Sequence, residues 1–136
     1  MKCGEKKRMS VSDRYLRKIL TAQIYDVAKE TPLEEATTLS ERLQNRILLK
    51  REDLQSVFSF KLRGAYNKMS NLSVSEMEKG VVAASAGNHA QGVALAARKL
   101  GIKAIIFMPE TTPGIKVNAV RSFGAIAKLV GDSYDE

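Results

Sequence analysis

Short apolar runs alternate with longer amphipathic stretches in the second half of the chain. The runs have the length and composition of buried strands, whereas apolar residues recur every three or four positions in the stretches between them. This pattern predicts a strand over Val81–Ala84, a helix over Asn88–Leu100, a strand over Lys103–Met108, a loop and helix over Pro113–Phe123 and a strand over Ile126–Val130. The β-α-β-α-β order is typical of an α/β fold with a parallel sheet and right-handed crossovers.

The first half of the chain is predicted to be mainly helical. We expect helices over Ser12–Leu20, Ala36–Leu43 and Phe60–Met69, a helical piece around Ile24 and Val27, a capped helix from Ser73 to Gly80, a buried strand over Ile47–Leu49 and a polar loop over Arg51–Val57. The capped helix follows from the Ser-x-x-Glu spacing of a capping box, and glycine is a frequent helix stop. The inner side of the third helix is expected to carry Leu62, Ala65, Tyr66 and Met69.

Length and composition place the chain among ordinary globular proteins. Its 136 residues suffice for one domain, and 44% of them are hydrophobic. The charged N-terminus is not followed by the apolar region of a secretory signal, and no apolar run has the length of a membrane span. Cys3 is the only cysteine, which fits a reducing compartment such as the cytoplasm. We therefore expect a cytoplasmic protein without a membrane partner.

The net charge of +7 raises the possibility of nucleic-acid binding. Residues 1–18 carry seven basic and two acidic side chains, so most of the excess lies near the N-terminus. A solvated basic leader over residues 1–13 explains this distribution better than a basic folded face does. We therefore expect no nucleic-acid partner.

Lys61 lies among apolar residues, with Phe58, Phe60 and Leu62 close to it in the sequence. This setting predicts a partly buried amine. Desolvation lowers the pKa of a lysine, and a neutral amine can attack a carbonyl carbon or accept a proton. The alternative interpretation is a solvated surface lysine, which the spacing alone does not exclude.

The loop Ser85–Gly92 connects a predicted strand to a predicted helix. Ligands of parallel α/β sheets bind beyond the carboxyl ends of strands, and backbone N–H groups at a helix N-terminus favour anions. An ordinary turn is the plainer alternative, and the full glycine pattern of a dinucleotide loop is missing. His89 is the only histidine, so we expect neither a metal site nor a serine triad.

Two motifs carry a resemblance to a known family. Lys50-Arg51-Glu52-Asp53 with Ser59-Phe60-Lys61-Leu62-Arg63-Gly64-Ala65, and Ser85-Ala86-Gly87-Asn88-His89, resemble the lysine motif and substrate loop of the serine/threonine dehydratases, which use pyridoxal phosphate (PLP). The resemblance runs from about Tyr15 to Glu136. Relatives that handle cysteine or make threonine carry an acidic residue soon after the lysine, and Leu62-Arg63 departs from that pattern. Ile115–Gly124 is most similar to the biosynthetic branch, which acts on threonine.

The resemblance implies a fold, a cofactor and residue roles. The fold would be the three-layer α/β arrangement with a parallel sheet known as tryptophan-synthase-β-like (fold type II), with PLP as cofactor. Lys61 would bond to the cofactor and later act as base, Phe60 would lie beside it, and Asn88 would contact the ring hydroxyl O3′. The substrate carboxylate would be held by Ser85, Ala86, Gly87, Asn88 and His89. The substrates would be L-threonine and L-serine, and threonine would give 2-oxobutanoate and ammonia at the start of isoleucine synthesis.

In this family a glycine-rich loop for the cofactor phosphate and a regulatory domain lie further along the chain, and the sequence has no adjacent glycines. We therefore expect residues 1–136 to be the N-terminal part of a PLP-dependent catalytic domain, inactive alone, whose parent is a homo-oligomer. The spacing in Ser133-Tyr134-Asp135-Glu136 also predicts the start of a further helix. A serine racemase or a catabolic serine/threonine dehydratase is one alternative, and a non-enzymatic truncated α/β module is another.

Overall fold

The computed structural model describes residues 10–133. Its helices are α1 (Val11–Leu20), α2 (Thr37–Leu43), α3 (Lys61–Met69), α4 (Val74–Lys79), α5 (Asn88–Leu100) and α6 (Gly114–Ser122), and its strands are β1 (Leu33–Glu35), β2 (Leu48–Lys50), β3 (Val81–Ala84), β4 (Ala104–Met108) and β5 (Ile126–Leu129). Two short 3₁₀ helices, Ile24–Asp26 and Glu52–Leu54, complete the list. Cys3, most of the basic leader and the last three residues of the predicted C-terminal helix start lie outside the described residues.

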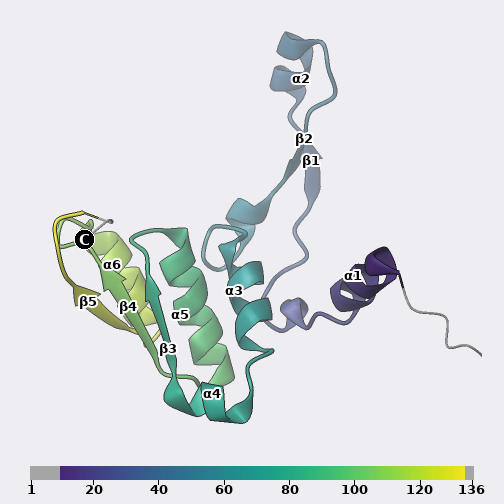
Figure 1. Cartoon of the computed structure of the whole chain (residues 1–136). Helices are drawn as coiled ribbons and strands as arrows, with labels where there is room; N and C mark the ends of the chain where they lie inside the picture. The colour runs from purple at the N-terminus through teal and green to yellow at the C-terminus, as the bar shows by residue number, and fades with distance from the viewer. Residues whose placement is uncertain (1–9, 134–136) are drawn as a thin grey trace, which may run out of the picture.

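Strands β3, β4 and β5 form a parallel sheet in the order β3-β4-β5, as the alternating pattern predicts. Figure 1 shows α5 and α6 together on one side of this sheet. Alternate residues of β4, namely Ala104, Ile106 and Met108, are buried in the same cluster as residues of α5 and α6. The opposite face carries Val82 and Ile126, which the register places on either side of Ile105, and both are exposed. The sheet therefore has one packed and one bare face.

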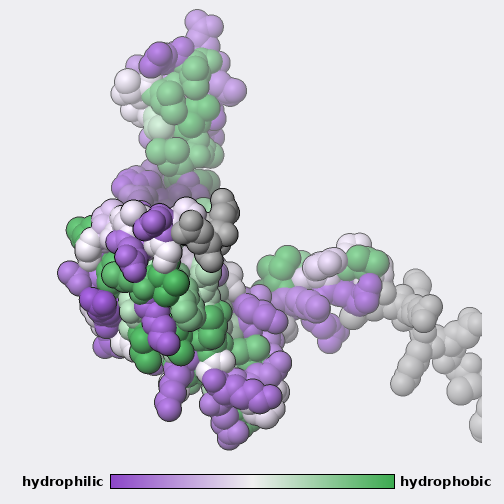
Figure 2. Space-filling view, turned by 60° about the vertical axis from the view of Figure 1, so that its left-hand side comes forward, coloured by the Kyte–Doolittle hydropathy of each residue, from purple (hydrophilic) through white to green (hydrophobic). Residues whose placement is uncertain are grey.

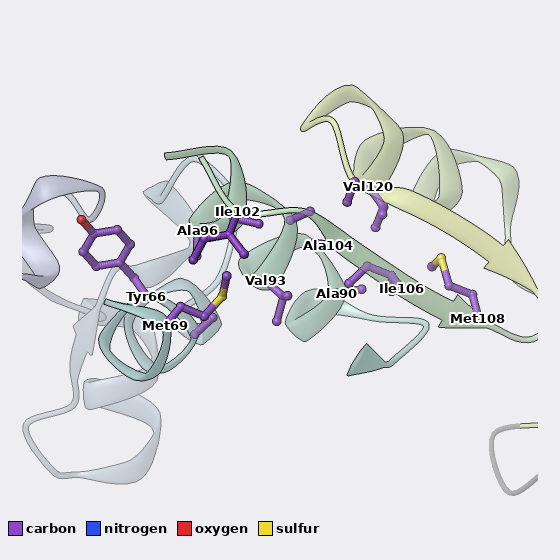
Figure 3. Packing of buried hydrophobic residues seen from close by; sticks show 14 of the residues in the cluster. Tyr66, Met69, Ala90, Val93, Ala96, Ile102, Ala104, Ile106, Met108 and Val120 are labelled. Atoms are coloured by element: carbon purple, nitrogen blue, oxygen red, sulfur yellow. The ribbon is translucent and has the colours of Figure 1, made fainter. Parts of the chain in front are cut away.

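The main core lies where α3, α5 and the sheet meet (Figure 3). Leu62, Ala65, Tyr66 and Met69 of α3 are buried, which confirms the predicted inner side of this helix. The buried face of α5 is rich in alanine, and small side chains let neighbouring backbones approach closely. The capping box at Ser73 begins α4, and the left-handed glycine Gly101 ends α5, both as predicted.

Residues 33–50 form an arm that extends away from the body (Figure 1). Strands β1 and β2 pair antiparallel, and α2 connects them. The prediction of a buried strand over Ile47–Leu49 is wrong in its burial, because Leu48 and Leu49 are exposed. A two-stranded ribbon has no second layer to cover its side chains. Figure 2 accordingly shows apolar surface on the arm, and the sequence pattern did not predict β1.

Helix α1 begins at Val11, earlier than predicted, with Ser10 as its N-cap. The hydroxyl of Ser10 accepts a hydrogen bond from the N–H of Asp13, whose carboxylate accepts from the N–H of Ser10. This reciprocal capping box satisfies two N–H groups at the helix start. Residues 10–13 therefore belong to a capped helix rather than to a flexible leader. The whole of α1 is exposed, including its apolar stripe.

Candidate active site

Lys61 is the first residue of α3, and its side chain is exposed. The prediction of a partly buried amine is wrong, because Phe58 and Phe60 are themselves 76% and 58% exposed. Leu62 is 0% exposed and packs inward. Successive helical residues point about 100° apart, so burying Leu62 directs Lys61 outward. The ammonium group lies 4.7 Å from the centroid of the Phe60 ring, a cation–π distance.

A tight turn leads the chain into α3. The N–H of Phe58 donates to the carbonyl of Gln55 at 2.8 Å, and Phe58 has a φ of 55°. This left-handed conformation is unfavourable for a bulky residue and persists where the surroundings impose it. Gln55 and Val57 belong to this turn, and their side chains are buried. The turn therefore fixes the position at which α3 begins, and with it the place of Lys61 on the surface.

A pocket of about 500 Å³ brings Lys61 and His89 together. Its remaining lining comes from α3, from the segment after α3, from β3 and from α5, and consists of Phe60, Gly64, Ala65, Lys68, Leu72, Val81, Val82, Ala83 and Val93. The wall is mainly apolar, with cationic groups of Lys61 and Lys68 on the α3 side. Such a pocket suits a ligand with a flat apolar body and a polar or anionic group.

The N-termini of α3 and α5 both contribute to this pocket. The N-cap residues are Phe60 and Gly87, and among the described residues no side chain caps either helix. The hydroxyl of Ser85 instead accepts from the N–H of Gly87 at 3.3 Å, before α5 begins. The positive ends of two helix dipoles therefore meet at this pocket without a side-chain cap among residues 10–133, and they favour an anion here.

The structure brings together some of the predicted site residues and not others. Phe60, Lys61 and His89 line the pocket, whereas the predicted substrate-loop residues Ser85, Ala86, Gly87 and Asn88 are not part of its lining. They form the connection from β3 to α5, and Asn88 is the exposed first residue of α5. The loop is anchored at its start, because the N–H of Ser85 donates to the carbonyl of Phe107 on β4.

Gly92 sets the approach of α5 to α3 and was missed as a site-forming residue. A Cβ atom at this position would lie 3.1 Å from the carbonyl carbon of Lys61 and 3.1 Å from the backbone nitrogen of Leu62. The helices therefore meet backbone to backbone beside the lysine. A lone glycine inside a predicted helix is a signal of such close packing, and it could have identified Gly92 from the sequence.

A polar network behind Lys61 was also missed, because residues 51–57 were predicted to be a loop. Glu52 accepts hydrogen bonds from Arg63 at 2.8 and 2.9 Å and from the hydroxyl of Thr31 at 2.6 Å. The side chain of Gln55 bonds to both the N–H and the carbonyl of Lys29, at 2.9 and 2.8 Å. Interactions between residues so far apart in sequence leave no local pattern.

The pKa of the Glu52 carboxyl is lowered from 4.5 to about 2. The main cause is hydrogen bonding from Arg63, with help from Thr31, the charge of Arg63 and Gln55, whereas burial opposes the shift. A carboxyl with a lowered pKa in the folded state stabilises the fold fully above its unfolded pKa, and this contribution is lost as the pH falls through the folded pKa. One pKa unit corresponds to about 1.4 kcal/mol, so the shift corresponds to about 3 kcal/mol.

We therefore expect the free energy of unfolding to fall by up to about 3 kcal/mol between about pH 5 and about pH 2, and Glu52→Gln to remove this loss. Urea titrations at a series of pH values measure the effect. Asp53→Asn is the matched control, because the neighbouring carboxyl also has a lowered pKa from Arg51 but is far more exposed. An unchanged pH slope in Glu52→Gln would show that another group titrates.

In the part of the chain that the structure describes, no helix is both long and apolar enough to cross a membrane.

Comparison with known proteins places this geometry in a family. The profile of the family described as "Pyridoxal-phosphate dependent enzyme" matches residues 24–136. A tomato (Solanum lycopersicum) protein, threonine dehydratase 1 biosynthetic, chloroplastic, is 62% identical over 122 residues, which are 90% of this chain and 20% of the relative. The L-threonine dehydratase biosynthetic IlvA of Burkholderia multivorans is 57% identical over 128 residues, 92% of this chain and 25% of the relative.

Solved structures agree with these sequence matches. The processed form of threonine deaminase isoform 2 from Solanum lycopersicum superimposes with a TM-score of 0.87 at 56% identity, covering 94% of this chain and 36% of that chain. Maize serine racemase superimposes with a TM-score of 0.82 at 34% identity, covering 88% and 37%. The chain thus spans a fifth to a quarter of the length of the tomato and Burkholderia multivorans threonine dehydratases.

Proposed function

Because this chain belongs to the pyridoxal-phosphate dependent enzyme family, we propose that it provides the cofactor lysine and the substrate loop for the conversion of L-threonine to 2-oxobutanoate and ammonia. The observation that carries the proposal is the pocket in which Lys61 and His89 meet at two helix N-termini. The 62% identity to a threonine dehydratase favours threonine over the substrates of relatives that are less similar.

The residues of the pocket fit PLP. The exposed amine of Lys61 is free to bond to an aldehyde carbon, and Phe60 beside it offers an aromatic face. Ala65, Val81 and Val93 supply an apolar wall for a flat ring. We assign the covalent bond to Lys61, the neighbouring ring contact to Phe60 and the ring hydroxyl to Asn88, the exposed residue at the start of α5.

The substrate carboxylate is assigned to the start of α5. Ser85, Ala86, Gly87, Asn88 and His89 lead into the N–H groups of the first turn, where a negative charge is stabilised. When bound, PLP supplies an electron sink for the charge that develops at the substrate Cα. The amine of Lys61 would accept the proton from Cα once the substrate amine has taken its place, and the β-hydroxyl would take up a proton and leave as water. Water then replaces the nitrogen, so that 2-oxobutanoate and ammonia are the products.

Threonine turnover is expected to need residues beyond those in this sequence, which has no pair of adjacent glycines for a cofactor phosphate. The proposed place of the complete enzyme is the first step of isoleucine synthesis, as a homo-oligomer. The cytoplasm stays the proposed compartment, although the name of the tomato relative places that protein in the chloroplast.

Covalent capture of PLP tests the proposal. The purified chain is mixed with PLP and reduced with borohydride, and the labelled peptide is identified by mass spectrometry. We expect the label on Lys61, together with a visible absorbance band that Lys61→Ala abolishes. Lys68→Ala is the matched control, because Lys68 lies on the same helix, lines the same pocket and should be dispensable for the band. Equal labelling of many lysines in a folded chain would contradict the proposal.

A serine racemase is the second candidate, supported by the structural similarity to the maize enzyme. Addition of L-threonine or L-serine to the PLP-treated chain distinguishes the two by the size of the change in the absorbance band. Product assays for 2-oxobutanoate and for D-serine follow. A response to L-serine alone would favour the racemase.

A further inference from the structure

Lys61 stands at an exposed helix end, so the precision of the site depends on what holds that end in place. The turn before it contains the unfavourable left-handed conformation of Phe58, which needs support from its surroundings. Among residues 10–133, the ammonium group of Lys61 contacts the ring of Phe60. The support must therefore come from residues on either side of the lysine.

Glu52 provides the first anchor. Its two carboxylate oxygens accept four hydrogen bonds, two from Arg63, one from Thr31 and one of 3.3 Å from Gln55. Arg63 follows Lys61 by two residues, and its side chain is 22% exposed, against 15% for Glu52. Two parallel hydrogen bonds from one guanidinium to one carboxylate fix the relative orientation of Arg63 and Glu52 as well as their distance. All four of these N–H and O–H groups are donors, so only an ionised carboxylate can accept from them all.

Arg63 and Gln55 extend the anchor to the segment that precedes the arm. Arg63 also donates to the carbonyl of Lys29 at 3.2 Å and lies 5.5 Å from the ring centroid of Tyr25. Gln55 holds the same Lys29 through both backbone groups. Three stretches of chain, 25–31, 52–55 and the first turn of α3, are thereby joined by polar contacts that are mostly half-buried.

We propose that Glu52, Gln55 and Arg63 form a clamp that positions the Lys61 end of α3 for reaction with the cofactor. The proposal rests on the proposed function, since it assigns the purpose of the clamp to Lys61. None of the three residues lines the pocket, so they are positioning residues and not catalytic residues. The charged groups that face Glu52 are Arg63 directly and Lys50 through the Thr31 carbonyl, to which its ammonium donates.

The clamp is tested by Glu52→Gln, Arg63→Gln and the double variant, with Asp53→Asn as the matched control. Borohydride capture is measured against PLP concentration for Lys61 and Lys68 separately. We expect each single variant to lower capture at Lys61 by about tenfold or more, because small displacements of a reacting group have large effects. Capture at Lys68 should stay unchanged. The double variant should be little worse than a single one, since both changes remove the same pair.

A second readout needs no cofactor. Amide hydrogen exchange in the peptide that contains Phe60–Gly64 should be faster in Glu52→Gln and Arg63→Gln than in Asp53→Asn. Arg63→Lys keeps the positive charge but cannot donate two parallel hydrogen bonds to Glu52. This variant should therefore fold and show an intermediate capture of PLP at Lys61. It replaces Arg63→Gln if that variant does not fold.

The outcomes separate the clamp from the proposed function. If the unaltered chain captures no PLP at Lys61, the proposed function fails, and unchanged hydrogen exchange would in addition overturn the clamp. If the unaltered chain captures PLP and the folded clamp variants capture it equally well, the clamp is overturned while the proposed function stands. An equal loss at Lys61 and Lys68 would indicate general unfolding and would also contradict a positioning role.

Discussion

Replacing Ile106 by alanine is expected to lower the free energy of unfolding by about 2–5 kcal/mol. Ile106 lies in the middle of β4 and is 0% exposed. Its side chain belongs to the core in which α3, α5, α6 and the sheet meet (Figure 3). Removing three carbon atoms there loses the transfer free energy and leaves a cavity that the rigid surroundings fill only in part. Urea unfolding followed by far-UV circular dichroism measures the change.

Ile126→Ala is the control for this prediction, because it removes the same atoms from a neighbouring strand of the same sheet. Ile126 is 55% exposed on the bare face. We expect its replacement to cost less than about 1 kcal/mol. Equal losses in the two variants would mean that the bare face is covered in solution and that the core is not confined to the helix side.

Gly92→Ala is expected to destabilise the chain by about 1–3 kcal/mol and to reduce PLP capture at Lys61. Alanine ordinarily stabilises a helix interior relative to glycine. Here the added carbon would meet the backbone of Lys61 and Leu62 at 3.1–3.2 Å. That backbone cannot yield easily, because Leu62 is fully buried and Arg63 is tied to Glu52. The helices must therefore separate, which moves Lys61 relative to the start of α5.

Gly64→Ala is the matched control for the stability measurement. Gly64 lies on α3, and a Cβ there would have no atom within 4 Å. We expect this change to be neutral or to stabilise the chain by about 0.5–1 kcal/mol. Opposite signs for the two glycines would confirm that close packing beside Lys61, rather than helix propensity, decides the result at Gly92.

Much of the second half was predictable because its signals are local. Each strand is an apolar run, each helix has a periodic apolar side, and serine or glycine marks several of the ends. In the first half, the buried side of α3 was also predicted in full, from Leu62 to Met69. The parallel order of β3, β4 and β5 followed from the intervening helices, because a parallel pair needs a crossover.

The arm and α1 show where local signals were insufficient. A run such as Ile47–Leu49 has the composition of a buried strand, but burial requires a second layer, and residues 10–133 provide none for β1 and β2. The start of α1 was placed one residue late, at Ser12 instead of Val11, because several residues near Ser10 can serve as caps.

The sequence alone predicted the family, the order of most of the elements and the two motifs that carry the resemblance, because residue type and helix or strand periodicity are properties of neighbouring residues. Only the tertiary structure decided that Lys61 is exposed, that His89 reaches the same pocket, that Gly92 lies against the lysine backbone and that Glu52 pairs with Arg63. These features arise from contacts between distant segments. Their geometry depends on how whole helices pack, which no local pattern records.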